Sequence, residues 1–138
     1  MGFDITKKEF EALAIEKLAD AELLLKEKRW SSAYYLSGYA VECAFKVCIT
    51  KAFKAETLPD KNFVNSTYNH DLKKLAEQAK LQGLINAASP ALKLNWTLAN
   101  VWVPEARYKS YTEATATEIF QAISDKADGV FEWIKAHW

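Results

Sequence analysis

The sequence predicts an all-α protein, an antiparallel up-and-down helical bundle of four long helices and one short one. Apolar residues recur three and four positions apart along most of the chain, which is the spacing of one helix face. No segment alternates polar and apolar residues for long enough to form a strand. Four Gly and three Pro in 138 residues are too few for the many tight turns of a β-sandwich. The length favours a single domain over residues 1–138.

Two long helices are predicted in the first part of the chain. The first begins at Thr6–Glu9, which has the sequence of a capping box, and fades around Lys28. The second is expected to be capped by Ser31 or Ser32 and to end at residues 53–54. Apolar side chains cover most of its circumference, so we expect other helices to surround it.

A connection and a shorter helix are predicted next. Residues 55–69 contain Pro, Asp and Asn at several positions and are expected to form a long loop that covers one end of the bundle. A helix over residues 71–81 follows, with Gly83 as the left-handed residue beyond its C-terminus.

Two more helices complete the predicted bundle. One begins at Ser89-Pro90, a favourable cap and first residue, carries Trp102 near its C-terminus and is ended by Pro104. The other begins at Thr112 or Thr115 and continues as a long helix to Trp138.

Composition and patterning exclude several classes of protein. Eighteen Lys and Arg balance eighteen Asp and Glu, which argues against binding of nucleic acid mainly through bulk positive potential but leaves room for a local patch. The N-terminus lacks the apolar core of a signal peptide. The most apolar stretch, Trp30–Thr50, carries Glu42 and Lys46, so we expect a helix of a soluble cytoplasmic protein rather than a membrane span.

The two cysteines also indicate a cytoplasmic protein. Cys43 and Cys48 lie five residues apart on different sides of one helix, which predicts two buried thiols in a reducing compartment. No Cys and His residues have the spacing of a zinc site, so neither a metal nor another cofactor is expected.

Candidate ligand-binding residues fall in three places. Glu42 and Lys46 lie one helical turn apart, either as a surface ion pair or as a pair held beside the core. His70 precedes the start of a helix, where anions bind, although Asn69 or Asp71 could simply cap that helix with His70 satisfied locally.

The third place is the basic and aromatic cluster that follows Pro104. Arg107, Tyr108 and Tyr111 could hold a phosphate and stack a base; the alternative is an interhelical salt bridge with packed tyrosines. The chain has no local signature of a Ser-His-Asp triad, no Gly-rich phosphate loop and no His-Glu-x-x-His sequence, so no familiar enzyme motif is present.

The segment Trp30–Lys46, which reads WSSAYYLSGYAVECAFK, resembles the "A-YYL-GYAVECALK" stretch of HEPN domains (higher eukaryotes and prokaryotes nucleotide-binding). Two shorter pieces agree in order. His70-Asp71-Leu72 with Leu75 is similar to the family's "HDL..L" segment, and Trp102–Tyr108 is similar to its "W…RY" segment. The resemblance covers nearly the whole chain, and the first stretch is its most specific part.

The resemblance implies an α-helical up-and-down bundle, usually a homodimer, in bacteria or archaea. HEPN proteins are often encoded beside a minimal nucleotidyltransferase, and many belong to toxin–antitoxin or other defence systems. Active members are metal-independent RNases that use an Arg and, after a gap of four to six residues, a His. The dimer brings these two residues together to activate the ribose 2′-hydroxyl.

The RNase motif of the family is incomplete in this chain. Arg107 matches the family's Arg-Tyr, but Thr112, Glu113 and Ala114 occupy the positions where the His would fall. Cleavage through the 2′-hydroxyl needs a proton acceptor that works near neutral pH. We therefore expect a non-catalytic dimeric module that binds a nucleotide, an RNA or a partner such as a nucleotidyltransferase. The alternatives are a metal-independent RNase in which His70 works with Arg107, and a purely structural subunit with an exposed patch containing tryptophans.

Overall fold

The computed structural model describes residues 4–138 and shows, within them, eight α-helices, one 3-10 helix and no strand. The elements are α1 (Lys7–Lys26), α2 (Trp30–Thr50), α3 (Lys61–Thr67), α4 (Leu72–Gln78), α5 (Gln82–Asn86), α6 (Pro90–Ala99), the 3-10 helix η1 (Pro104–Tyr108), α7 (Glu113–Ser124) and α8 (Val130–Lys135). The predicted all-α class is therefore confirmed. None of the helices in this range combines the length and the apolar character that crossing a bilayer requires.

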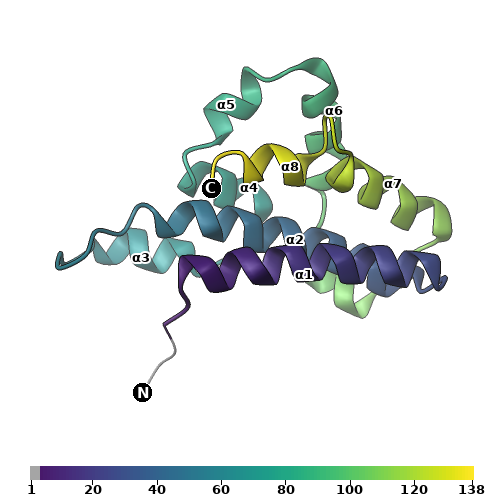
Figure 1. Ribbon diagram of the computed structural model, residues 1–138, viewed down its shortest axis with the longest axis horizontal. Helices are drawn as coiled ribbons and strands as arrows, with labels where there is room; N and C mark the ends of the chain where they lie inside the picture. The colour runs from purple at the N-terminus through teal and green to yellow at the C-terminus, as the bar shows by residue number, and fades with distance from the viewer. Residues whose placement is uncertain (1–3) are drawn as a thin grey trace.

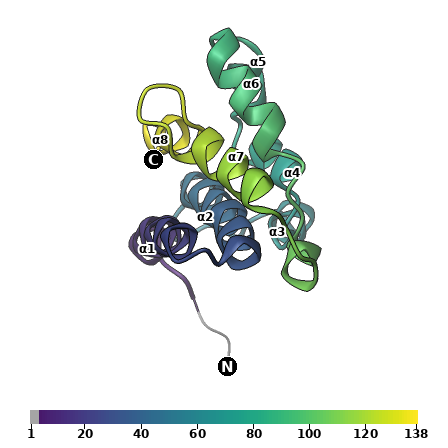
Figure 2. The ribbon, with the colours of Figure 1, turned by 90° about the vertical axis from the view of Figure 1, so that its right-hand side faces the viewer.

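Helix α2 lies at the centre of the molecule. It runs antiparallel beside α1, and α4 to α8 lie above this pair in Figure 1. Viewed along the pair, α2 sits between α1 and α7 (Figure 2). It also contacts α4, α8 and η1, and the side chains of Val41, Phe45 and Val47 are fully buried. The expectation that other helices surround the second helix is confirmed.

The predicted helix starts agree with the structure at three positions. Thr6 caps α1 in a complete capping box, because its hydroxyl accepts from the Glu9 backbone while the Glu9 carboxylate accepts from the Thr6 N–H. Ser89 caps α6, and Pro90 is its first residue. Of the two threonines proposed for the last helix, Thr112 is the cap of α7.

The ends of α2 and the connection after it differ from the prediction. Helix α2 starts after Arg29 rather than at a serine cap, and the Ser31 hydroxyl instead accepts from the Tyr111 backbone N–H. The helix ends at Thr50, three residues before the predicted end. Part of the predicted loop is helical, because the Asp60 carboxylate accepts from the Phe63 N–H and so caps α3.

The predictions for the second half are wrong at three boundaries. The helix predicted over residues 71–81 ends earlier, at Gln78, and Lys80 rather than Gly83 has the positive φ that follows it. Gly83 lies inside α5. Helix α6 ends at Ala99, and Pro104 starts η1 instead of ending a helix.

The predicted long last helix is two helices. α7 ends at Ser124, and α8 begins after Gly129. A Cβ atom on Gly129 would overlap the backbone of Asp125 and Ile123, so this close chain reversal requires glycine. The helical spacing of apolar residues continues across the break and therefore gives no sign of it.

Candidate functional site

A groove of about 820 Å³ lies along α2 and is closed by residues of α1, α3, η1 and the segment before α4. We call it the Glu42 groove, and it is defined here by the lining residues Tyr35, Tyr39, Glu42, Lys46, His70 and Arg107. Four of the six residues singled out in the sequence thus line one groove, although they come from three separate segments. Tyr108 and Tyr111 are outside its lining.

One stripe of α2 forms the floor of the groove. Tyr35, Tyr39, Glu42 and Lys46 follow one another at intervals of four, three and four residues, which keeps them on one side of the helix. Tyr35 and Tyr39 were not predicted as site residues, because the apolar pattern of this helix places all of its aromatic residues in the core. Their register with the Glu-Lys pair was the signal that distinguished them.

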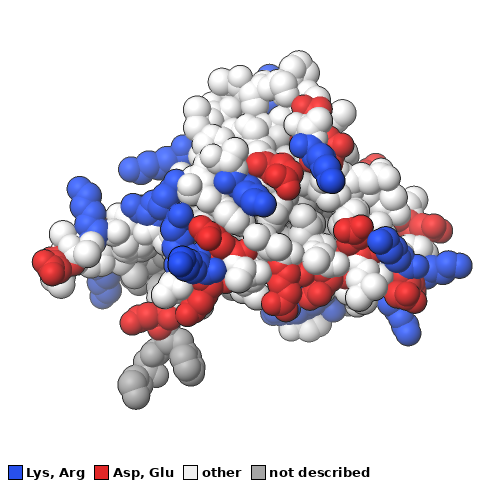
Figure 3. Space-filling view, in the orientation of Figure 1, with Lys and Arg blue, Asp and Glu red and all other residues white. Residues whose placement is uncertain are grey.

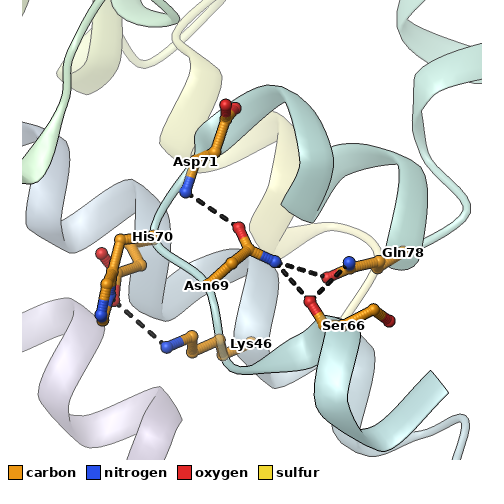
Figure 4. Close-up of polar contacts among 7 residues, drawn as sticks. Lys46, Ser66, Asn69, His70, Asp71 and Gln78 are labelled. Atoms are coloured by element: carbon orange, nitrogen blue, oxygen red, sulfur yellow. Dashed lines mark hydrogen bonds and ion pairs between the residues drawn. The ribbon is translucent and has the colours of Figure 1, made fainter. Parts of the chain in front are cut away.

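Glu42 lines the groove although its side chain is buried beside the core. Its side chain is only 4% exposed, and its Oε2 atom lies 3.2 Å from Lys46 Nζ and 2.9 Å from His70 Nδ1. Figure 4 shows His70 and Lys46 near each other, and the dashed line from Lys46 marks its contact with this carboxylate. The pair is therefore held beside the core, and it fixes the segment that carries His70. The reading as a surface ion pair is wrong.

Neighbouring residues hold the backbone around His70. The Asp71 carboxylate accepts from the N–H groups of Lys73 and Lys74 and caps α4, while the Asn69 side chain accepts from Asp71 N–H and donates to Gln78 (Figure 4). The expected capping roles are thus present. His70 nevertheless bonds to a distant helix rather than locally, and its side chain remains 58% exposed at the groove.

The turn that carries Arg107 is fastened to α2 by Trp102. The Trp102 ring lies directly against Gly38, where any Cβ atom would overlap it, and its Nε1 donates to the backbone oxygen of Tyr35 at 3.1 Å. Trp102 is 1% exposed. The glycine of the GYAVE sequence therefore has a packing role, because it lets η1 and Arg107 approach the groove.

Arg107 and Tyr108 form an exposed pair at the edge of the groove. The Arg107 guanidinium carbon lies 5.0 Å from the centre of the Tyr108 ring, which is 77% exposed. The pKa of Arg107 is raised above its ordinary value, first by Tyr108 and then by Tyr35. Tyr111 has a different position, since its ring stacks on Tyr34 with centroids 3.7 Å apart. It packs the start of α7 against α2.

Burial raises the pKa values of two groups that line the groove, the Cys43 thiol and the Tyr39 phenol. It raises the pKa of Cys43 to about 12 and that of Tyr39 to about 12, and in each case nearby acidic groups, including Glu42, add to the effect. The groove therefore offers an uncharged thiol and phenol beside Lys46 and Arg107. Within residues 4–138 no cluster of His, Cys, Asp or Glu could hold a metal ion.

The remaining surface offers fewer specific features. Acidic and basic side chains mix along α1 in Figure 3, while the upper part of that face, over α5 and α6, is largely uncharged. A second, more open hollow of about 1220 Å³ lies between α6 and α7, and none of the six candidate residues lines it. Of the large apolar residues exposed in the described chain, none is a tryptophan, so the patch expected for a purely structural subunit is not found.

Comparison with known proteins adds no assignment. No protein-family model matches the chain, and no curated protein or solved structure matches it either. The structure itself defines the class as an all-α protein with a groove that combines tyrosines, cations and one buried carboxylate.

Proposed function

We propose that the chain is a HEPN-like, non-catalytic module that binds a nucleotide or an RNA end in the Glu42 groove. The resemblance of Trp30–Lys46 to HEPN domains supports this family, and with it the finer fold description of an antiparallel up-and-down bundle. The central position of α2 and its antiparallel pairing with α1 support this description.

The observation that carries the proposal is the convergence of Lys46, His70 and Arg107 on one groove with Tyr35 and Tyr39. Guanidinium and ammonium groups bind phosphate oxygens, and tyrosine rings supply faces on which bases stack. The formal net charge of the chain is zero, so affinity must come from these local contacts rather than from a long-range field.

A homodimer and a minimal nucleotidyltransferase partner in a toxin–antitoxin or defence setting belong to the same proposal, because the resemblance implies them. Exposed apolar side chains on and after α6, among them Leu94 and Val101, are the surface that we propose for such contacts. Light scattering of wild type and of Leu94→Lys tests the dimer. The proposal expects a dimer for the first protein and a monomer for the second.

A second candidate function is metal-independent RNA cleavage, and one contact favours it. An ionised carboxylate can only accept, so Nδ1 of His70 donates in the bond to Glu42, and in the neutral ring this leaves Nε2 as the nitrogen that can accept a proton. Such an Nε2 could take the proton of a ribose 2′-hydroxyl as it attacks the neighbouring phosphate, whose charge Arg107 would stabilise. The products would be a 2′,3′-cyclic phosphate and a free 5′-hydroxyl.

Titration with a labelled single-stranded RNA hexamer and with adenosine monophosphate tests the proposed function. We expect saturable binding that weakens about tenfold or more in Arg107→Ala, since one charge-assisted contact to phosphate is lost. Arg29→Ala is the matched control, because Arg29 is the only other arginine and its side chain makes no cap hydrogen bond. Absence of binding by wild type would contradict the proposal.

The same samples separate the two candidate functions. A binding module leaves the RNA intact after long incubation with chelator, whereas the RNase yields cyclic-phosphate ends and loses this activity in His70→Ala. Cleavage that depends on His70 would replace the first function with the second.

A further inference from the structure

We propose that Glu42 reads the sugar of the bound ligand, so that the groove selects ribonucleotides, free or within an RNA, over their 2′-deoxy counterparts. This inference rests on the proposed function and adds the residue that sets its specificity.

Glu42 is the only charged residue in the described part of the chain that is classed as buried. Both of its ion-pair partners, Lys46 and His70, bind the same oxygen, Oε2. No partner of Oε1 occurs among the hydrogen bonds of residues 4–138. An ionised carboxylate can accept on both oxygens. Oε1 is not among the fully buried side-chain atoms without a partner, so it is accessible from the groove. Because Glu42 lines the groove, a donor group of a bound ligand can reach this oxygen.

The chemistry of the groove restricts that donor. A phosphate would be repelled by a carboxylate, so the phosphate belongs with the cations, and a neutral hydroxyl suits Oε1. Along α2, Glu42 lies between the tyrosines and Lys46. A ribonucleotide matches this order, since its ribose hydroxyls lie between the base and the phosphate. Within an RNA chain the 3′-oxygen is esterified, which leaves the 2′-hydroxyl as the donor. A carboxylate that accepts from a ribose 2′-hydroxyl is an established mode of nucleotide recognition, and this hydroxyl distinguishes RNA from DNA.

The expected discrimination is large for a single group. A site that bonds a hydroxyl binds the analogue without it more weakly, because the charge-assisted hydrogen bond to the carboxylate is lost. We expect the dissociation constant to rise about tenfold or more when the 2′-hydroxyl is removed.

The experiment is a binding titration of wild type by calorimetry or fluorescence anisotropy in two arms. One arm compares adenosine monophosphate with its 2′-deoxy and 2′-O-methyl forms, and the other compares RNA, DNA and 2′-O-methyl hexamers of one sequence. We expect the ribose ligand to bind about tenfold or more tightly than either analogue, because the methyl ether keeps the oxygen but cannot donate. The arm in which binding occurs identifies the source of the ligand.

The variant Glu42→Gln tests the residue, with Glu118→Gln as control, since Glu118 lines only the α6–α7 hollow. The amide is a weaker acceptor, so the preference for ribose should fall several-fold in Glu42→Gln and stay unchanged in Glu118→Gln. Should Glu42→Gln not fold, the comparison of ribose and 2′-O-methyl ligands on wild type still tests whether the groove needs a 2′-hydroxyl donor.

The failures are distinguishable. Equal binding of ribose and deoxyribose ligands overturns the inference and leaves the proposed function standing, as does a preference that survives in folded Glu42→Gln. No binding of any ligand overturns both.

Discussion

Nδ1 of His70 lies 2.9 Å from Oε2 of Glu42, although 28 residues separate the two in the chain. This bond ties the segment between α3 and α4 to the central helix, and it leaves the imidazole at the surface of the groove. His70 is thereby both a structural link and a candidate ligand contact, so its substitution should affect stability as well as binding.

Replacing His70 with Ala should lower the free energy of unfolding by about 1–2 kcal/mol, because the buried Glu42 loses one of its two partners. His70→Asn is the matched variant, since its amide can donate from nearly the position of Nδ1. Urea unfolding should show that most of the loss is recovered in His70→Asn. Equal stability of His70→Ala and wild type would mean that the bond to Glu42 contributes nothing.

Gly38→Ala should destabilise the fold and weaken ligand binding together. The new Cβ would overlap the Trp102 ring, and overpacking of this kind costs about 1–3 kcal/mol even though alanine is the better helix former. Displacement of Trp102 should also move Arg107, because η1, which carries Arg107, begins two residues after Trp102.

Gly83→Ala is the control for this substitution. No atom lies within 4 Å of the position of its Cβ, so the change should leave binding unaltered and raise stability by up to about 1 kcal/mol. Thermal unfolding of both variants measures the difference. A Gly38→Ala protein as stable as Gly83→Ala would contradict the close packing of Trp102.

Alkaline pH should destabilise the protein. Burial raises the pKa of Cys43 from 9.0 to about 12 and the pKa values of Tyr34 and Tyr39 from 10.0 to about 12. Above pH 9 the folded state therefore holds protons that the unfolded chain has released. The stability from these groups is complete below pH 9 and is lost as the pH rises toward 12.

Urea unfolding between pH 8 and 11 measures this decline. Tyr39→Phe removes one of the three groups and should make the decline shallower, whereas Tyr68→Phe, at an 81% exposed position, should not change it. A free energy of unfolding that stays constant or rises over this range would rule out the linkage.

Local signals predicted the parts of the fold that local interactions determine. The caps at Thr6 and Ser89 and the buried character of α2 follow from neighbouring residues, and the structure has them. The break before α8 was missed because the apolar spacing persists through it. Ala127, which keeps that spacing, is exposed in the connecting turn.

The groove was predictable only in part. Glu42 and Lys46 are neighbours on one helix, so their pairing can be anticipated from the sequence. The positions of His70 and Arg107 at the groove depend on where α3, Trp102 and η1 pack. Such tertiary contacts have no signal in the neighbouring sequence. Tyr111 was predicted to bind a ligand together with Arg107, but its ring stacks on Tyr34 and has a packing role instead.

The most direct test of the account is a backbone and side-chain NMR titration of isotope-labelled protein with adenosine monophosphate and with a short single-stranded RNA. We predict that the largest shift changes fall on the residues that define the Glu42 groove, with those of Tyr35, His70 and Arg107 foremost. The α6–α7 hollow should change little. Shift changes centred on that hollow, or none with either ligand, would contradict the central claim that this groove is the binding site.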